Sequence, residues 1–263
     1  MDFTAVKYNE IIVRGNYSKI LKAVAKTEQG SQEIIVKRVN NTARKTFLRE
    51  IAALQYNANP GIIRLYGYDN KKKEMYLEDL TDQGISISRY IDHNGKLTPK
   101  EALPLLSSIS KSLAYIHTRT TEKPAFIHYD ISDNNVFILN VAETKIIDFG
   151  TSFEDGGYPA EHDTWCIGTP RYNAPEKITK NRNKETTAVD VYAFGILGYK
   201  MLVGIEPFTE MVGSLNRQIC FDSPAPINST HKPLDNILMD CLAKDPRQRP
   251  SMDNIYTQLE QYR

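Results

Sequence analysis

Two apolar runs of strand character, separated by a polar loop and followed by a second polar turn, constrain the fold of this chain most. From residue 126 the chain reads FIHYDISDNNVFILN, and TKIIDFG follows from residue 144. Runs of these residue types, bounded by polar turns, predict short buried strands. The strands would present Asp130, Asn135 and Asp148 from adjoining turns. Two carboxylates and an amide so placed could hold a metal-bound nucleotide beside an attacking hydroxyl.

Composition and charge exclude several classes of protein. At 263 residues the chain is long enough for a substantial core, as one large domain or two small ones. Apolar residues make up 41% and charged residues 25% of the chain, which is typical of a globular protein and not of a disordered one. The formal net charge of +1 gives no bulk attraction to nucleic acid, so we expect no nucleic-acid partner.

The first residues and the cysteines bear on the compartment. MDFTAVKYNEIIVRG lacks an apolar core preceded by cations, and no later run reaches membrane-spanning length. We therefore expect a soluble, cytoplasmic protein without membrane insertion. Cys166, Cys220 and Cys241 are odd in number and lack C-x-x-C spacing, which predicts free thiols and no zinc site. The sequence leaves the oligomeric state open.

Hydrophobic periodicity predicts an α+β chain whose first part is rich in strands and whose second part is helical. One helix is predicted over residues 43–56, and strands over 10–13, 20–26, 33–39, 62–68 and 74–77. In this helix Phe47, Ile51 and Leu54 form an apolar stripe. Because Glu50 lies off the centre of the stripe, it could reach across to the sheet.

Further helices are predicted over residues 99–117, 189–202, 237–243 and 255–262. The first begins after Thr98, an N-cap residue, with Pro99 at its first position. Between the two parts the sequence EDLTDQG breaks the periodicity with acidic and turn residues. We therefore expect a cleft between two lobes, with the first lobe over residues 1–78, a hinge over 79–84 and the second lobe over 85–263.

With these motifs in order, the chain resembles the eukaryotic-type Ser/Thr protein kinase family over essentially its whole length. IVK, which ends at Lys37, resembles the family's V-A-I-K strand, and FLRE, which ends at Glu50, resembles its helix motif. HYDISDNN is similar to its catalytic loop and GTPRYNAPE to its peptide-docking segment. The resemblance implies that residues 1–263 form one bilobal protein kinase domain. Its small N-terminal lobe would be an antiparallel sheet with one helix, and its larger C-terminal lobe mainly helical.

The resemblance also implies the roles of the side chains that carry the chemistry. Lys37, tied to Glu50, would hold the α and β phosphates of ATP. Asp130 would accept the proton of a hydroxyl on a protein substrate. Asn135 and Asp148 would bind Mg²⁺, for which Mn²⁺ could substitute.

Other positions would build the nucleotide site and hold the catalytic loop. The residues that the resemblance places against ATP are Val13, Gly15, Ser18, Ile20, Ile35, Lys37, Leu77, Glu78 and Leu80. Thr169 would steady Asp130. The structural positions that it implies are His128 and Phe149 in a column that joins the lobes, Asp190 as the anchor of the catalytic loop, and Glu176 paired with Arg249.

Three positions depart from the family pattern. VRGNYS, which ends at Ser18, keeps only the middle glycine of G-x-G-x-x-G, so the backbone approaches phosphates less freely. Ser132 stands where Ser/Thr kinases carry a lysine that neutralises the transferring phosphate. Loss of one such donor costs about a hundred- to a thousandfold in turnover, unless Arg171 or a substrate residue compensates. Tyr129 replaces the arginine that usually precedes the catalytic aspartate, which makes the chain a non-RD type.

Two functions from different classes fit these residues. The first is a protein kinase that transfers the γ-phosphoryl group of ATP to Ser or Thr hydroxyls of protein substrates. The second is a pseudokinase that uses the fold as a nucleotide-binding or allosteric scaffold. A scaffold has no chemical need for Lys37, Glu50, Asp130, Asn135 and Asp148 together, so we favour the enzyme. A small-molecule phosphotransferase is disfavoured, since a small substrate needs no platform like GTPRYNAPE.

Overall fold

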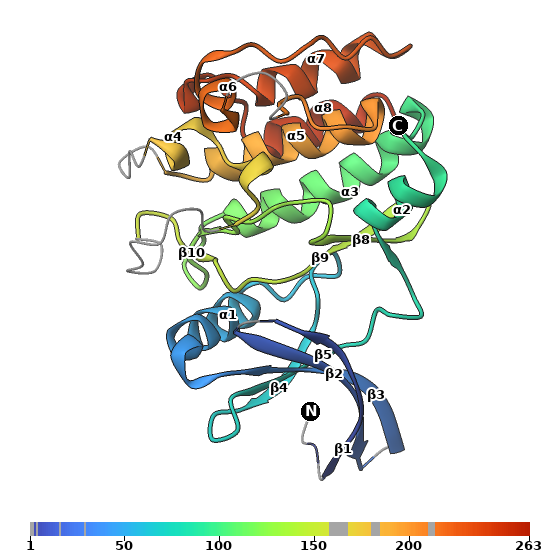
Figure 1. Cartoon of the computed structure of the whole chain (residues 1–263), viewed down its shortest axis with the longest axis vertical. Coiled ribbons are helices and arrows are strands. Elements are labelled where there is room, and N and C mark those ends of the chain that lie inside the picture. Colours follow the sequence, from blue (N-terminus) through green and yellow to red (C-terminus); the bar gives the residue numbers. More distant parts are fainter. Residues whose placement is uncertain are drawn as a thin grey trace.

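The computed structural model describes residues 3, 5–15, 17–28, 30–157, 168–179, 185–209 and 214–263. A strand-rich part with one helix and a larger helical part lie at opposite ends of the molecule (Figure 1). This is the α+β architecture that the sequence predicts. Cys220 and Cys241 are free thiols, whereas Cys166 lies outside the described residues.

The strand-rich part is a five-stranded antiparallel sheet with the order β1-β2-β3-β5-β4. Its strands are β1 (Ala5–Arg14), β2 (Ser18–Thr27), β3 (Gly30–Val39), β4 (Leu65–Asp69) and β5 (Glu74–Glu78). The register pairs Ile20 with Lys37 and Ile35 with Leu77, so these four side chains share one face. Ile35 and Leu77 belong to the main core of the molecule. Lys37 therefore lies on the face that is turned toward the helical part.

The opposite face of this sheet carries a second, smaller hydrophobic cluster. It consists of the alternate residues of β2, β3 and β5, namely Leu21, Ala23, Ala25, Ile34, Val36 and Tyr76. Phe3, from the N-terminal segment, packs edge-on against Tyr76 with 5.5 Å between the ring centroids. Both faces of the central strands are thus covered, which fixes their register, because a slip of one residue would exchange the two sets.

Helix α1 (Arg44–Tyr56) packs beside the sheet and turns its apolar stripe inward. Phe47, Ile51 and Leu54 are buried, as the stripe predicts. Asn40 begins the preceding 3-10 turn, where its side chain accepts a hydrogen bond from Ala43. Glu50 is also buried, at 2% exposure, so its carboxylate must find a partner inside the molecule.

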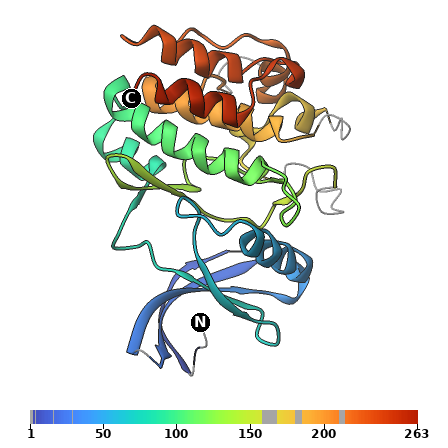
Figure 2. The same cartoon turned by 180° about the vertical axis from the view of Figure 1, so that it is seen from behind.

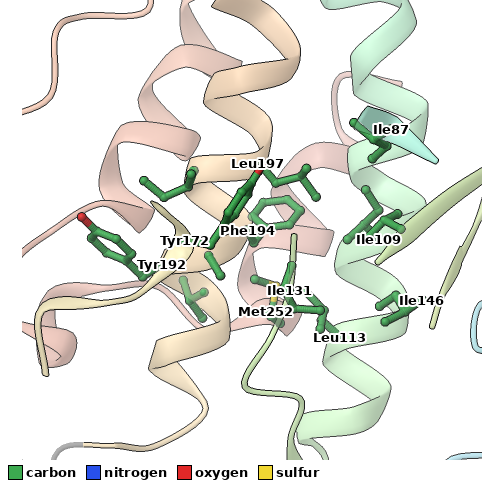
Figure 3. Packing of buried hydrophobic residues seen from close by; sticks show 14 of the residues in the cluster. Ile87, Ile109, Leu113, Ile131, Ile146, Tyr172, Tyr192, Phe194, Leu197 and Met252 are labelled. Carbon is green, nitrogen blue, oxygen red and sulfur yellow. The ribbon is translucent and has the colours of Figure 1, made fainter. Parts of the chain in front are cut away.

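The helical part is built around two long helices that lie side by side (Figures 1 and 2). Its helices are α2 (Ile87–Asn94), α3 (Pro99–His117), α4 (Pro175–Ile178), α5 (Ala188–Val203), α6 (Leu215–Phe221), α7 (Lys232–Cys241) and α8 (Met252–Glu260). Figure 3 shows Phe194 and Leu197 of α5 packing toward Ile109 and Leu113 of α3, with Ile131 in the same cluster. In the part of the chain that the structure describes, no helix is long and apolar enough to cross a membrane.

The start of α3 shows why its boundary could be predicted. Thr98 accepts a hydrogen bond from the Glu101 amide, and the Glu101 carboxylate accepts one from the Thr98 amide at 2.8 Å. Pro99 occupies the first helical position, where its missing N–H costs nothing. This reciprocal capping confirms the predicted helix over residues 99–117.

Short strands bracket both polar turns, as the apolar runs predict. β7 (Phe126–Ile127) and β8 (Val136–Asn140) flank residues 128–135, which we call the polar loop. β9 (Glu143–Ile146) and β10 (Phe153–Glu154) flank residues 147–152, which contain the DFG sequence. β8 pairs with β9 and with β6 (Ile85–Ser86), while β10 pairs with β7. The two polar turns are therefore held next to each other.

Several boundaries differ from those predicted. The strand predicted over 62–68 begins at Leu65, because Ile62 makes only a single bridge with Ile146. Helix α7 begins five residues before the predicted position, since the His231 side chain caps it. The sequence did not predict α2, α4 and α6, which have eight, four and seven residues. Elements of one or two turns are too short to show a helical period.

Candidate active site

Lys37 joins the sheet, α1 and the DFG turn through its ammonium group. Its Nζ donates to the Glu50 carboxylate at 2.8 Å and to Asp148 Oδ1 at 2.7 Å. Burial alone would lower the pKa of Lys37, but the Asp148 and Glu50 carboxylates outweigh it and raise that pKa. In return, the Lys37 charge holds the pKa of Asp148 below its ordinary value. Burial raises the pKa of Glu50 to about 7 in spite of the Lys37 charge, so Lys37 and Asp148 are the members of this cluster whose charged forms are favoured.

The Asp130 carboxylate is oriented by hydrogen bonds from two directions. The amide and the hydroxyl of Thr169 donate to Oδ1 at 2.8 and 2.9 Å. The Asn135 Nδ2 donates to Oδ2 at 3.1 Å and to the Asp130 carbonyl at 2.9 Å. These bonds fix the carboxylate in one rotamer and join the polar loop to the segment of residues 168–176, which we call the docking segment.

Asn135 and Asp148 supply oxygen atoms that suit a hard divalent cation. The Ile147 amide donates to the Asn135 carbonyl at 2.9 Å, which brings the two polar turns together just before Asp148. The Asn135 nitrogen is turned to Asp130, so its side-chain oxygen faces away from that residue. The Asp148 side chain is 48% exposed, and its backbone has a left-handed φ of 62°. A carboxylate and an amide oxygen, with phosphates and waters completing the shell, are ligands of the kind that Mg²⁺ takes.

Asp190, in the first turn of α5, holds the backbone of the polar loop. Its carboxylate accepts hydrogen bonds from the amides of His128 at 2.7 Å and Tyr129 at 2.8 Å, and from the His117 ring at 3.0 Å. Burial would raise the pKa of Asp190, but its hydrogen bond from His117 and the neighbouring His128 hold that pKa below its ordinary value. The carboxylate is 1% exposed, and these three donors compensate for its desolvation.

Glu176 and Arg249 form a two-pronged ion pair in the helical part. The two Arg249 terminal nitrogens donate to the two Glu176 oxygens at 2.7 and 2.9 Å. The Arg249 side chain is 0% exposed and the Glu176 side chain 2%. Arg249 also donates to the carbonyls of Ala243 and Ala188, each at 2.8 Å. The pair therefore joins the end of the docking segment to the start of α5.

His128 and Phe149 lie in contact beneath the cluster around Lys37. Their rings meet edge to face with 4.6 Å between centroids, and both residues are fully buried. The His128 Nε2 lies 3.1 Å from the Ile147 carbonyl. Leu54 is buried and Leu65 half-buried. The structure thus places side chains of both parts in one core cluster.

The residues expected to cover a nucleotide line the inner face and the edge of the sheet. Register places Val13 opposite Ile20, on the face that carries Lys37. The Gly15 amide donates to the Ser18 carbonyl at 2.9 Å, which closes the β1–β2 turn. Val13 is 52% exposed, so this end of the sheet leaves apolar surface uncovered.

Residues 78–84 connect β5 with β6 and carry the remaining predicted contacts. The Glu78 amide donates to the Arg64 carbonyl at 3.0 Å, and its carboxylate pairs with Lys145 at 2.6 Å. The Leu80 carbonyl accepts bonds from the Gln83 and Gly84 amides. The Leu80 amide has no hydrogen-bond partner among the described residues. It is thus a backbone donor that a ligand could use.

The structure also brings to the polar loop residues that the motifs did not indicate. Lys177 donates to the Tyr129 carbonyl at 2.7 Å, and the Tyr129 hydroxyl donates to Glu185 at 2.8 Å. Ser132, the position without the family's lysine, is fully buried, and its hydroxyl has no partner within the described part of the chain. Arg171 lies in the 3-10 turn Pro170–Tyr172. Only contacts between distant segments identify Lys177 and Glu185, so no local pattern could have indicated them.

Comparison with known proteins agrees with this geometry. The sequence pattern of the protein kinase domain matches residues 6–259. The chain is 26% identical over 260 residues to a probable serine/threonine-protein kinase of Dictyostelium discoideum, covering 95% of this chain and 15% of that protein. It is 31% identical over 217 residues to serine/threonine-protein kinase PkaA of Streptomyces coelicolor, covering 80% of this chain and 38% of the relative.

A third relative is mitogen-activated protein kinase kinase kinase 7 of Bos taurus, with 26% identity over 264 residues, 97% of this chain and 43% of the relative. The chain therefore spans less than half the length of each of these three proteins. The match to the family pattern nonetheless covers nearly every residue and includes all the motifs described above. This chain belongs to the protein kinase domain family.

Proposed function

We propose that the chain transfers the γ-phosphoryl group of ATP to Ser or Thr hydroxyls of protein substrates. The observation that carries the proposal is the cluster in which Lys37 contacts both Glu50 and Asp148. One ammonium from the sheet thereby meets the turn that carries Asp148, and the Ile147 amide joins that turn to Asn135 in the polar loop. The names of the relatives, which are Ser/Thr protein kinases, support the choice of hydroxyl.

Each polar group of the site would have one task. Lys37, oriented by Glu50, would bind the α and β phosphates. Asn135 and Asp148 would hold Mg²⁺, or Mn²⁺ in its place, which neutralises phosphate charge when it is bound. Asp130 would accept the hydroxyl proton as the new bond forms.

The nucleotide base would lie between the sheet and residues 78–84. Val13, Ile20 and Ile35 would cover its faces, and Leu77 would lie at its inner edge as gatekeeper, as their common position on the inner face allows. Glu78 and Leu80 would offer backbone groups to its edge, with the Leu80 amide as donor. Gly15 and Ser18, at the β1–β2 turn, would lie over the phosphates.

The remaining proposals concern the supporting residues and the chain as a whole. Thr169 would hold Asp130, and Asp190 would hold the loop that carries it. We infer one domain over residues 1–263, with lobes over 1–78 and 85–263 and a hinge over 79–84. A protein substrate would lie along the docking segment. Free thiols at Cys220 and Cys241 agree with a reducing compartment, so we place the domain in the cytoplasm.

Transfer of label from γ-labelled ATP, in the presence of Mg²⁺ and a generic protein substrate, tests the proposal. We expect Asp148→Ala to lower the rate by at least about a hundredfold, because a carboxylate that orients the charged phosphates is lost. Asp92→Ala, which removes an exposed carboxylate from α2, serves as the control and should match the unsubstituted chain.

The same assay separates the enzyme from a scaffold. Retained ATP binding without any transfer would favour a pseudokinase and contradict the proposal. Absence of both binding and transfer would remove the nucleotide site as well. The enzyme remains the better reading, since a scaffold has no chemical need for Thr169 and Asn135 to orient the Asp130 carboxylate from two sides.

A further inference from the structure

Lys177 is a half-buried cation that has no part in the roles described above. It lies in α4, directly after Glu176, and its Nζ donates to the Tyr129 carbonyl at 2.7 Å. The same Nζ lies 3.8 Å from the centroid of the Tyr129 ring, which is the geometry of a cation–π contact. Its two close partners are therefore uncharged groups of the residue that immediately precedes Asp130.

The charges that surround Lys177 come from four segments. Burial lowers the pKa of Lys177 to about 8, and the carboxylates of Asp130, Asp190, Glu185 and Glu176 oppose that fall. Asp130 contributes most among them. The ammonium is thus charged at neutral pH and lies beside the polar loop.

Gly168 shows how closely the groups approach one another. A Cβ atom added at this position would lie 3.2 Å from Asp130 Oδ1, 3.3 Å from the Lys177 Nζ and 3.3 Å from the Tyr129 carbonyl oxygen. The small recess that Tyr129, Asp130 and Lys177 help to line has no room for a water molecule. Lys177, Asp130 and the Tyr129 carbonyl are therefore packed around one glycine.

Tyr129 is held by contacts of its amide, its carbonyl, its hydroxyl and its ring. Its amide donates to Asp190 at 2.8 Å, its carbonyl accepts from Lys177, and its hydroxyl donates to Glu185 at 2.8 Å. The Phe153 ring meets it edge to face at 5.1 Å. Its backbone has a left-handed φ of 70°, a strained conformation for a non-glycine residue that its surroundings must maintain.

We propose that Lys177 is a positioning residue for phosphoryl transfer, which ties the docking segment to the polar loop and holds Asp130 in place. The inference rests on the proposed function. The polar loop has no lysine or arginine of its own, because Ser132 stands where the family carries its lysine. Lys177, which lies outside the loop, donates a hydrogen bond to the Tyr129 carbonyl next to Asp130. Thr169 donates to the Asp130 carboxylate itself. The first bond holds the backbone beside Asp130, and the second holds the Asp130 side chain.

The test compares Lys177→Met, Lys177→Arg and a matched control in steady-state phosphoryl transfer. Lys244→Met is the control, because the Lys244 Nζ also donates to a carbonyl, that of Ile219 at 2.6 Å, and lies 4.3 Å from the Phe208 ring centroid. Burial also lowers the pKa of Lys244 to about 8. It differs in lying away from the polar loop. Assays are made at a temperature where thermal unfolding shows every variant to be folded.

We expect Lys177→Met to lower kcat by at least about tenfold while KM for ATP stays within about twofold, since misplacement of Asp130 affects only the reacting geometry. Lys177→Arg should recover most of the rate, because a guanidinium can donate to the same carbonyl. Lys244→Met should keep the kcat of the unsubstituted chain. A kcat of Lys177→Met equal to that of Lys244→Met would overturn the inference.

A second measurement does not depend on activity. Amide hydrogen exchange at residues 129–131, 169, 171 and 172 should be faster in Lys177→Met than in Lys244→Met. If the unsubstituted chain transferred no phosphoryl group, the proposed function would fail, and exchange would still decide whether Lys177 holds the loop. Equal exchange in both variants would show that it does not.

Discussion

Replacing Asp130 by asparagine is expected to lower kcat for phosphoryl transfer by about a thousandfold and to leave ATP binding intact. The substitution keeps the shape of the side chain, and its oxygen can still accept the hydrogen bonds from Thr169, whereas the bond from the Asn135 amide is lost. The amide cannot take up the proton of the substrate hydroxyl, and positioned proton acceptors contribute about 10² to 10⁴ in rate. Asp130 makes no direct bond to Lys37, so the phosphate-binding group is undisturbed.

Single-turnover transfer from γ-labelled ATP, with nucleotide affinity measured by titration, checks this expectation. Asp92→Asn, at the exposed position on α2, is the control for a general effect of losing a carboxylate. A variant that kept more than a tenth of the rate would show that another group, or solvent, takes the proton. Lost affinity for ATP would show instead that Asp130 supports the nucleotide site.

Replacing Arg249 by methionine should lower the free energy of unfolding by about 3 to 5 kcal/mol, since it leaves the Glu176 carboxylate buried without its partner. Both side chains are almost wholly inaccessible to solvent. The change also removes the donor to the carbonyls of Ala243 and Ala188. Breaking a buried pair costs more than the pair contributes, because the remaining charge keeps its desolvation penalty.

Urea unfolding, followed by circular dichroism, measures this loss. Arg247→Met is a close control, since Arg247 lies two residues away and pairs with Asp245 but is 83% exposed. We expect little change there, because solvent screens an exposed pair. Adding Glu176→Gln to Arg249→Met should restore part of the stability, as the stranded charge is removed. Equal losses from Arg249→Met and Arg247→Met would contradict the account.

The parts of the fold that could be predicted are those in which a local signal is strong. Helix α3 shows both a long apolar stripe and a reciprocal cap at Thr98, so both of its ends were predicted. The strands around the polar loop were predicted because apolar runs of β-branched and aromatic residues flank it. Helices α2 and α6 were not predicted because two turns give too few apolar positions. The strand predicted from Ile62 begins only at Leu65, because a residue in a single bridge resembles a strand residue in sequence.

The candidate site shows the same division. Asp130, Asn135 and Asp148 could be proposed together because a loop of fixed length and two short strands set their separation. The His117 contact with Asp190 and the Lys177 contact with Tyr129 join residues 73 and 48 positions apart. Such contacts depend on how α3, α4 and α5 pack, and no spacing within one segment encodes them. The sequence thus indicates the groups of the site, and the packing decides which residues hold them in place.

A crystal structure of the chain with a non-hydrolysable ATP analogue and Mn²⁺ tests the central claim most directly. Anomalous scattering locates the metal without reference to the rest of the density. We expect the ion to be bound by the Asn135 side-chain oxygen and the Asp148 carboxylate, with the Lys37 ammonium on an α- or β-phosphate oxygen. A metal bound elsewhere, or Lys37 turned away from the phosphates, would contradict the account.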